Sequence, residues 1–200
     1  MVQKFLKVSL GLIFSTMLVG VAEAHTGVGI THGFTSGFGH PMTGLDHILA
    51  MVAVGMFAAH LGGRAMWLVP MSFVAMMAVG GAMGVTGVGL PLVELGIAMS
   101  VIVLGALVAL QTSMPTSIAM GLVGFFALFH GHAHGAEMPE DVGGLTYAAG
   151  FMLATALLHV AGLGIGLGLS RLASIHSKRI IQAGGVAMAA AGVGILTGVI

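Results

Sequence analysis

Long apolar stretches, separated by short polar or glycine-rich breaks, dominate the pattern of this chain. A membrane-spanning helix needs about 20 mostly apolar residues, and six stretches approach or reach that length. Most of the breaks are short, so consecutive helices are expected to be antiparallel neighbours. We therefore predict an all-α, polytopic membrane protein with six transmembrane helices. The predicted spans are residues 44–61, 65–85, 91–110, 117–129, 145–169 and 180–199.

The amino-terminal segment has a different character from the rest. Lys4 and Lys7 precede an apolar stretch, and Ala22-Glu23-Ala24 supplies small residues at the two positions that a signal peptidase reads. This pattern predicts a cleavable signal peptide over residues 1–24 and a mature six-helix transmembrane domain over residues 25–200. An uncleaved first transmembrane helix is the alternative interpretation.

Composition supports lipid as the solvent and removes several function classes. Hydrophobic residues make up 58% of the chain and charged residues 6%, whereas a soluble domain has about a quarter charged residues. The chain has no cysteine, which excludes disulfides, thiolate metal ligands and thiol nucleophiles. Its formal net charge is zero and it has no basic block, so binding of nucleic acid is excluded.

The basic residues of the mature region predict its orientation. Cleavage leaves the new amino terminus outside the cytoplasm, and alternate loops then face the cytoplasm. All four basic residues of the mature region fall in these cytoplasmic loops, as the positive-inside rule requires. We therefore expect a multi-pass protein of the bacterial inner membrane with both mature termini in the periplasm. Three spans in each half also allow a 3+3 inverted repeat. Association of several copies into a homo-oligomer is a further possibility. The four basic residues are Arg64, Arg171, Lys178 and Arg179.

Histidine is the functional signal of the sequence. Ten histidines accompany only six basic and six acidic residues, and most are clustered on the predicted outer side. Imidazole nitrogens together with carboxylate oxygens suit borderline divalent ions such as nickel, cobalt, zinc or copper. The predicted metal ligands are His25, His32, His40, Asp46, His47, His130, His134 and Glu137.

The first motif, His-Pro-Met-Thr-Gly-Leu-Asp-His, covers residues 40–47. Pro41 suits the first turn of a helix, which predicts that His40 lies at or just before the cap of the first span. Seven residues then bring His47 back to nearly the same helical face as His40. Asp46 is expected either to bind the cation or to accept a proton from an imidazole, and a structural hydrogen bond to another helix is the alternative.

The second motif, Phe-His-Gly-His-Ala-His-Gly-Ala-Glu, covers residues 129–137. A helix that continues through its two glycines would stack His130, His134 and Glu137 on one face, with His132 pointing elsewhere. A plain solvated loop is the alternative for this segment.

The remaining histidines have weaker assignments. After cleavage, His25 would combine a free amine with an imidazole and, together with His32, would capture ions outside the membrane. A chance histidine at the cleavage site is the competing interpretation. His60 and His159 either mark an inward path or are packed polar residues.

Both histidine motifs, in this order and combined with a signal peptide and six spans, make the chain resemble the HupE/UreJ family of nickel and cobalt permeases. The first motif continues into Ala50-Met51 and Val54-Gly55, and the resemblance covers essentially the whole chain. It implies uptake of nickel, or of cobalt in some members, which supplies metalloenzymes such as hydrogenase or urease through their maturation systems. It implies no cofactor beyond the transported ion, for which the resemblance favours Ni²⁺ first and Co²⁺ next, although the ligand types alone do not order the two ions.

The predicted function is therefore secondary transport, or facilitated uptake, of a divalent transition-metal ion from the periplasm into the cytoplasm. No Walker A string occurs, so the chain is not expected to be the motor of an ATP-driven pump. A membrane metal-binding scaffold or sensor, which delivers metal to an enzyme partner without transport, is the alternative. The HExxH string of metal hydrolases is also missing, and we expect no enzymatic activity.

Overall fold

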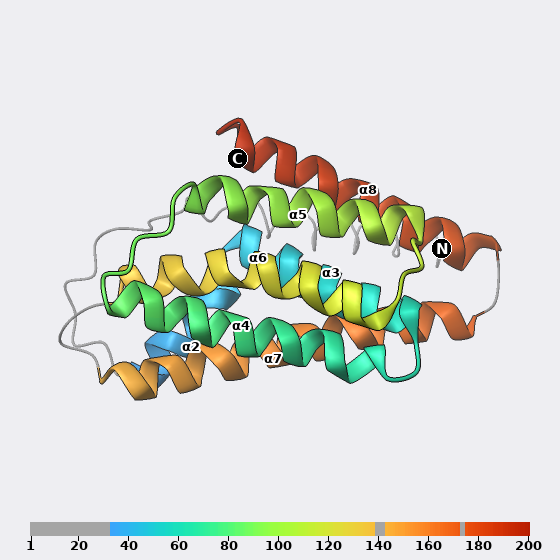
Figure 1. Ribbon diagram of the computed structural model, residues 1–200. Coiled ribbons are helices and arrows are strands. Elements are labelled where there is room, and N and C mark those ends of the chain that lie inside the picture. Colours follow the sequence, from blue (N-terminus) through green and yellow to red (C-terminus); the bar gives the residue numbers. More distant parts are fainter. Residues whose placement is uncertain (1–32, 139–142, 173–174) are drawn as a thin grey trace, which may run out of the picture. The chain divides into compact units, whose positions relative to one another are not determined.

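The computed structural model describes residues 33–138, 143–172 and 175–200, and in these residues the regular secondary structure is entirely helical (Figure 1). The predicted signal peptide lies outside the described residues. The helices are α2 (Gly33–Thr43), α3 (Leu45–Leu61), α4 (Ala65–Val85), α5 (Val93–Leu110), α6 (Thr116–Ala136), α7 (Gly144–Arg171) and α8 (Ile175–Leu196).

Five helices of the described chain, α4 to α8, are long and apolar enough to cross a membrane. The pair α2 and α3 passes the same test jointly, but the two helices are bent by 79° at the break between them. The described residues therefore contain five candidate spans, or six if the bent pair counts as one. This makes the chain a multi-pass membrane protein, and the count of six spans stays a prediction.

The bend corrects the prediction for the first motif. Pro41 does not begin the first span; it lies inside α2, and the chain breaks at Gly44, which has an extended backbone with φ −80° and ψ 119°. Proline lacks a backbone donor, so α2 is short of one internal hydrogen bond at Pro41, and the Thr43 hydroxyl donates to the His40 carbonyl at 2.9 Å in its last turn. The extended backbone of Gly44 then separates α2 from α3. The prediction that His40 and His47 share one face of a single helix is wrong, because they lie on opposite sides of the bend.

The second motif is helical to its end. α6 continues to Ala136, whereas the sequence predicted a span that ends at residue 129. The glycines in this last part contact α4 closely: an added Cβ at Gly131 would lie 2.0 Å from the Met77 carbonyl oxygen, and one at Gly135 would lie 2.1 Å from the Gly81 carbonyl oxygen. Gly131 and Gly135 would disfavour a helix in isolation, but here they allow α6 to pack closely against α4.

The closest helix pairs are not consecutive in the sequence. Helices α3 to α8 alternate in direction, as expected from short connections, but α4 packs most extensively against α6, α5 against α8, and α3 against α7 (Figure 1). The expectation that consecutive helices are the main neighbours is therefore wrong. α3 lies between α4, α5 and α7, and its side chains from Ala53 to Ala58 are buried all the way round. It forms the centre of the bundle.

Two adjacent glycines of α4 provide a test of this packing. A Cβ at Gly80 would lie 2.2 Å from the Leu128 carbonyl oxygen, whereas one at Gly81 would meet nothing closer than 3.6 Å. We expect Gly80→Ala to lower the free energy of unfolding by about 1–3 kcal/mol, because the α4 and α6 backbones must separate. Gly81→Ala should leave stability unchanged or slightly raised, because alanine is the better helix former. Reversible unfolding in mixed detergent micelles measures both, and equal effects would contradict the packing.

Candidate metal centre

Imidazole rings from α2, α3 and α6 meet where the bent pair faces the carboxyl-terminal end of α6. The ring centroid of His134 lies 4.5 Å from that of His40 and 4.4 Å from that of His47. The His47 ring lies 4.8 Å from the His130 ring. The fold thus brings four of the predicted ligands, separated by up to 94 positions in the sequence (134 minus 40), into one cluster.

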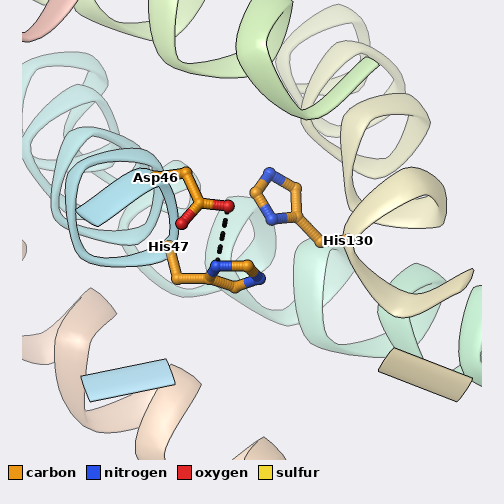
Figure 2. Close-up of side chains that lie close together, drawn as sticks. All are labelled: Asp46, His47 and His130. Carbon is orange, nitrogen blue, oxygen red and sulfur yellow. Dashed lines mark ion pairs between the residues drawn. The ribbon is translucent and has the colours of Figure 1, made fainter. Parts of the chain in front are cut away.

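The break at Gly44 shapes the α3 side of this cluster. An added Cβ at Gly44 would lie 2.8 Å from Asp46 Oδ1 and 2.9 Å from His47 Nδ1. A side chain at this position would therefore force Asp46 or His47 to move from the positions that they occupy beside the bend. They form an ion pair, with 2.9 Å between His47 Nδ1 and Asp46 Oδ2 (Figure 2).

Asp46, His47 and His130 form the tightest group of potential ligands in the described chain. One ligand atom from each lies within 4.8 Å of the others, and Figure 2 shows the His130 ring directed at the Asp46–His47 pair. His47 and His130 are buried, whereas the Asp46 side chain keeps 25% of its surface exposed. A carboxylate at the rim with two imidazoles beneath it offers one negative charge and two neutral nitrogen donors to a cation.

A hydrogen bond to α5 orients His130. Ser100 Oγ donates to the Ile97 carbonyl at 2.6 Å, so its single proton is used there. The 2.8 Å contact between Ser100 Oγ and His130 Nε2 therefore has the imidazole as donor. This leaves His130 Nδ1 with a lone pair, and that nitrogen has no hydrogen-bond partner among the described residues. Ser100 thus presets His130 as a metal-binding tautomer.

His47 is held from both sides. Its Nδ1 pairs with Asp46, which leaves the Nε2 lone pair to accept a hydrogen bond from His134 Nε2–H at 2.5 Å. In this arrangement His134 Nδ1 carries the other lone pair, and it too has no partner among the described residues. A metal ion on His47 Nε2 would displace the His134 ring, so the two histidines exchange a hydrogen bond for a bound ion.

An aromatic wall from α7 closes one side of the cluster. The Phe151 ring lies 4.5 Å from the His134 ring and 6.2 Å from the His47 ring. Beside it, a cavity of about 610 Å³ lies between α4, α6 and α7 and is lined almost entirely by apolar groups. His134, Tyr147 and Met77 contribute to its wall. The cluster is therefore bordered by apolar groups on this side.

The other histidines and Glu137 lie differently. Glu137 is the exposed residue that caps α6, outside the three-residue group. His132 Nε2 donates to the Val88 carbonyl at 2.8 Å and so ties α6 to the connection between α4 and α5. His60, at the other end of α3, lies 3.4 Å from the Ser113 hydroxyl. The predicted ligands His25 and His32 lie outside the described residues.

Sequence reasoning missed Ser100 and Phe151. Ser100 is the single hydroxyl-bearing residue of the predicted span 91–110, and a polar residue in the middle of an apolar span is a usable signal. Phe151 carries no such signal, since any aromatic residue suits a membrane helix. Its role depends on which helix lies opposite.

Comparison with known proteins agrees with the two motifs. The family of HupE / UreJ proteins matches residues 12–195 of the chain. The chain is also 49% identical to Protein HupE of Rhizobium leguminosarum bv. viciae over 181 residues, which cover 90% of this chain and 93% of that protein. No solved structure matches the chain. Because the match spans nearly all of the sequence, the resemblance predicted from the histidine motifs is confirmed, and the chain belongs to the HupE/UreJ family.

Proposed function

We propose that this protein carries a divalent transition-metal ion, nickel first and cobalt next, from the periplasm into the cytoplasm as a secondary transporter or facilitator. The observation that carries the proposal is the group of Asp46, His47 and His130, whose ligand atoms lie within 4.8 Å of one another inside a bundle of membrane-crossing helices. Membership of a family associated with nickel and cobalt uptake supports the same substrate and its delivery to enzymes such as hydrogenase or urease.

The donor set favours a borderline ion. Imidazole nitrogens suit nickel, cobalt, zinc and copper, whereas calcium and magnesium take six or more oxygen ligands. One carboxylate neutralises part of the charge of a divalent ion, which lowers the cost of removing that ion from water. Geometry and ion availability, rather than donor type, decide between nickel and cobalt.

Burial favours transport over a scaffold that passes metal to an enzyme. His47 and His130 are 4% and 0% exposed, and they lie between helices rather than on a loop that another protein would contact. A delivery scaffold needs its ligands within reach of its partner. A carrier needs them inside the bundle, where an ion exchanges water for protein ligands.

The bundle has a charged end opposite the metal centre. Arg64 precedes α4, Arg171 ends α7, and Lys178 lies in the first turn of α8, and these helix ends lie together (Figure 1). The centre lies at the ends where α3 begins and α6 finishes. By the positive-inside rule the basic end faces the cytoplasm, so the centre opens toward the periplasm and both mature termini lie there.

The cysteine-free sequence allows a direct test of this orientation. Gly89 and Ser113 are exposed and lie on opposite ends of α5, before and after it. A membrane-impermeant maleimide should label Gly89→Cys in intact cells and Ser113→Cys only after permeabilisation. The reverse pattern would place the metal centre on the cytoplasmic side and contradict uptake through it.

Uptake itself is tested with His47→Ala, which removes the imidazole that contacts both Asp46 and His134. We expect cells without other nickel importers to accumulate trace nickel when they express the wild type, and only background levels when they express His47→Ala. Excess cobalt should compete. His176→Ala, at an exposed position of α8, is the matched control and should retain uptake at equal membrane levels. Purified wild type that binds nickel without any cellular accumulation would favour the scaffold or sensor.

The role of Ser100 in orienting His130 is tested by metal affinity. Ser100→Ala removes the acceptor of the His130 Nε2 proton, so the ring can adopt the other tautomer and orientation. Loss of such an orienting partner weakens metal binding by about 10–100-fold. Competition with a chromophoric chelator measures the affinity of the purified protein for nickel. Ser72→Ala is the control, because the hydrogen-bond partners of the Ser72 hydroxyl are the Val69 and Met120 carbonyls and not a histidine. Equal nickel affinities of Ser100→Ala and Ser72→Ala would contradict the role of Ser100 in orienting His130.

A further inference from the structure

His159 is a buried imidazole for which the metal centre has no use. It lies in the middle of α7, is 2% exposed, and neither ring nitrogen has a hydrogen-bond partner among the described residues. A neutral imidazole carries one hydrogen-bond donor and one acceptor, and each of them that lacks a partner in an apolar interior costs about 1–3 kcal/mol. A leucine or phenylalanine would fill this space without that cost. An orphan of this kind in a packed bundle therefore requires an explanation.

Three side chains of α4 and α7, those of Thr155, Met77 and Phe73, form a chain of contacts beside His159. Thr155 lies one turn before His159 on the same face of α7, is fully buried, and donates from Oγ1 to the Met77 sulfur at 3.7 Å. The Phe73 ring, one turn from Met77 on α4, lies 5.0 Å from the His159 ring in an edge-to-face arrangement. An imidazole, a hydroxyl and a thioether can all donate electron pairs to a metal ion, and none of them carries a negative charge.

The inner group of His159, Thr155 and Met77 lies next to the metal centre, on the side farther along α7. The same Phe73 ring that contacts His159 lies 5.7 Å from the His130 ring. Along α7, Phe151 touches the cluster, and His159 follows eight residues later (159 minus 151), which is about 12 Å deeper at 1.5 Å per residue. Met77 also lines the cavity whose wall includes His134. The Phe73 ring therefore contacts a histidine of each group, and the cavity borders Met77 on one side and His134 on the other.

We infer that His159, with Thr155 and Met77 beside it, is a second and weaker binding station for the transported ion, which receives the ion from the outer centre past Phe73. This inference rests on the proposed function. In the described chain, the tight group of acidic and histidine ligands is the outer one, which contains Asp46. An ion at His159 lacks such a carboxylate and is held less strongly, and weak binding deep in the bundle suits release toward the cytoplasm.

The inner station is tested by metal binding to the full-length protein in lipid nanodiscs, with Ni²⁺ as the probe. Equilibrium dialysis should show one tight and one weaker nickel ion for the wild type. His159→Leu, which keeps much of the side-chain volume but no nitrogen, should lose the weaker ion and keep the tight one. His176→Leu, on the exposed face of α8, is the matched control and should keep both. Retention of both ions by His159→Leu would overturn the inference.

Uptake kinetics separate the inner station from a purely structural role. His159→Leu should lower the maximal rate of nickel uptake and leave the half-saturating nickel concentration near that of the wild type, because the outer centre still captures the ion. A higher half-saturating concentration with an unchanged maximal rate would assign His159 to the outer centre and overturn the inference. If His159→Leu fails to fold, Thr155→Val and Met77→Leu replace it, and unchanged weak binding in both would overturn the inference.

The two proposals fail in distinguishable ways. Wild type that accumulates no nickel in cells contradicts the proposed transport, whereas the dialysis result still decides whether His159 binds an ion. Wild-type uptake together with identical binding by wild type and His159→Leu contradicts the inner station alone.

Discussion

A carboxylate among apolar helices is stabilised by a partner, because an aspartate costs about 2.5–3.5 kcal/mol at the centre of a membrane helix on insertion scales and less toward its ends. Asp46 has such a partner in His47, with 2.9 Å between their atoms, and keeps part of its surface exposed beside the break at Gly44. The bend at Gly44 lies beside this pair, and α6 brings His130 to within 4.8 Å of it. The rest of the centre is assembled around it.

Glycine contacts between helices set the depth of the histidines. Gly131 lies between His130 and His132 on α6, and its backbone packs against the Met77 carbonyl of α4. A bulkier residue would push α6 away from α4 and move the His130 ring relative to Ser100 on α5. The small residues thus act on the chemistry of the centre through distances between backbones, in addition to stabilising the bundle.

Buried histidines of this chain differ in what satisfies them. His132 donates to a backbone carbonyl and acts as a structural link between α6 and the connection that follows α4. His47 uses both ring nitrogens, with Asp46 and His134. His130 and His134 each use Nε2 and, like His132, have no partner on Nδ1 among the described residues. His159 lacks a partner on both nitrogens in the described chain. The more of its hydrogen-bonding capacity an imidazole leaves unused, the stronger its case as a binding group.

The sequence by itself determined the membrane character, most span positions, the family and the two histidine motifs, because hydropathy and motif spacing are local properties that survive without knowledge of the fold. It did not determine the α2 helix or the bend at Gly44, since Pro41 is equally at home in the first turn of a helix. Nor did it determine that α6 packs on α4, or that Ser100 and Phe151 reach the cluster. Those features depend on which helices lie side by side. The helices are apolar on nearly all faces, so their neighbours are decided by close packing in three dimensions and not by a hydrophobic pattern in the sequence.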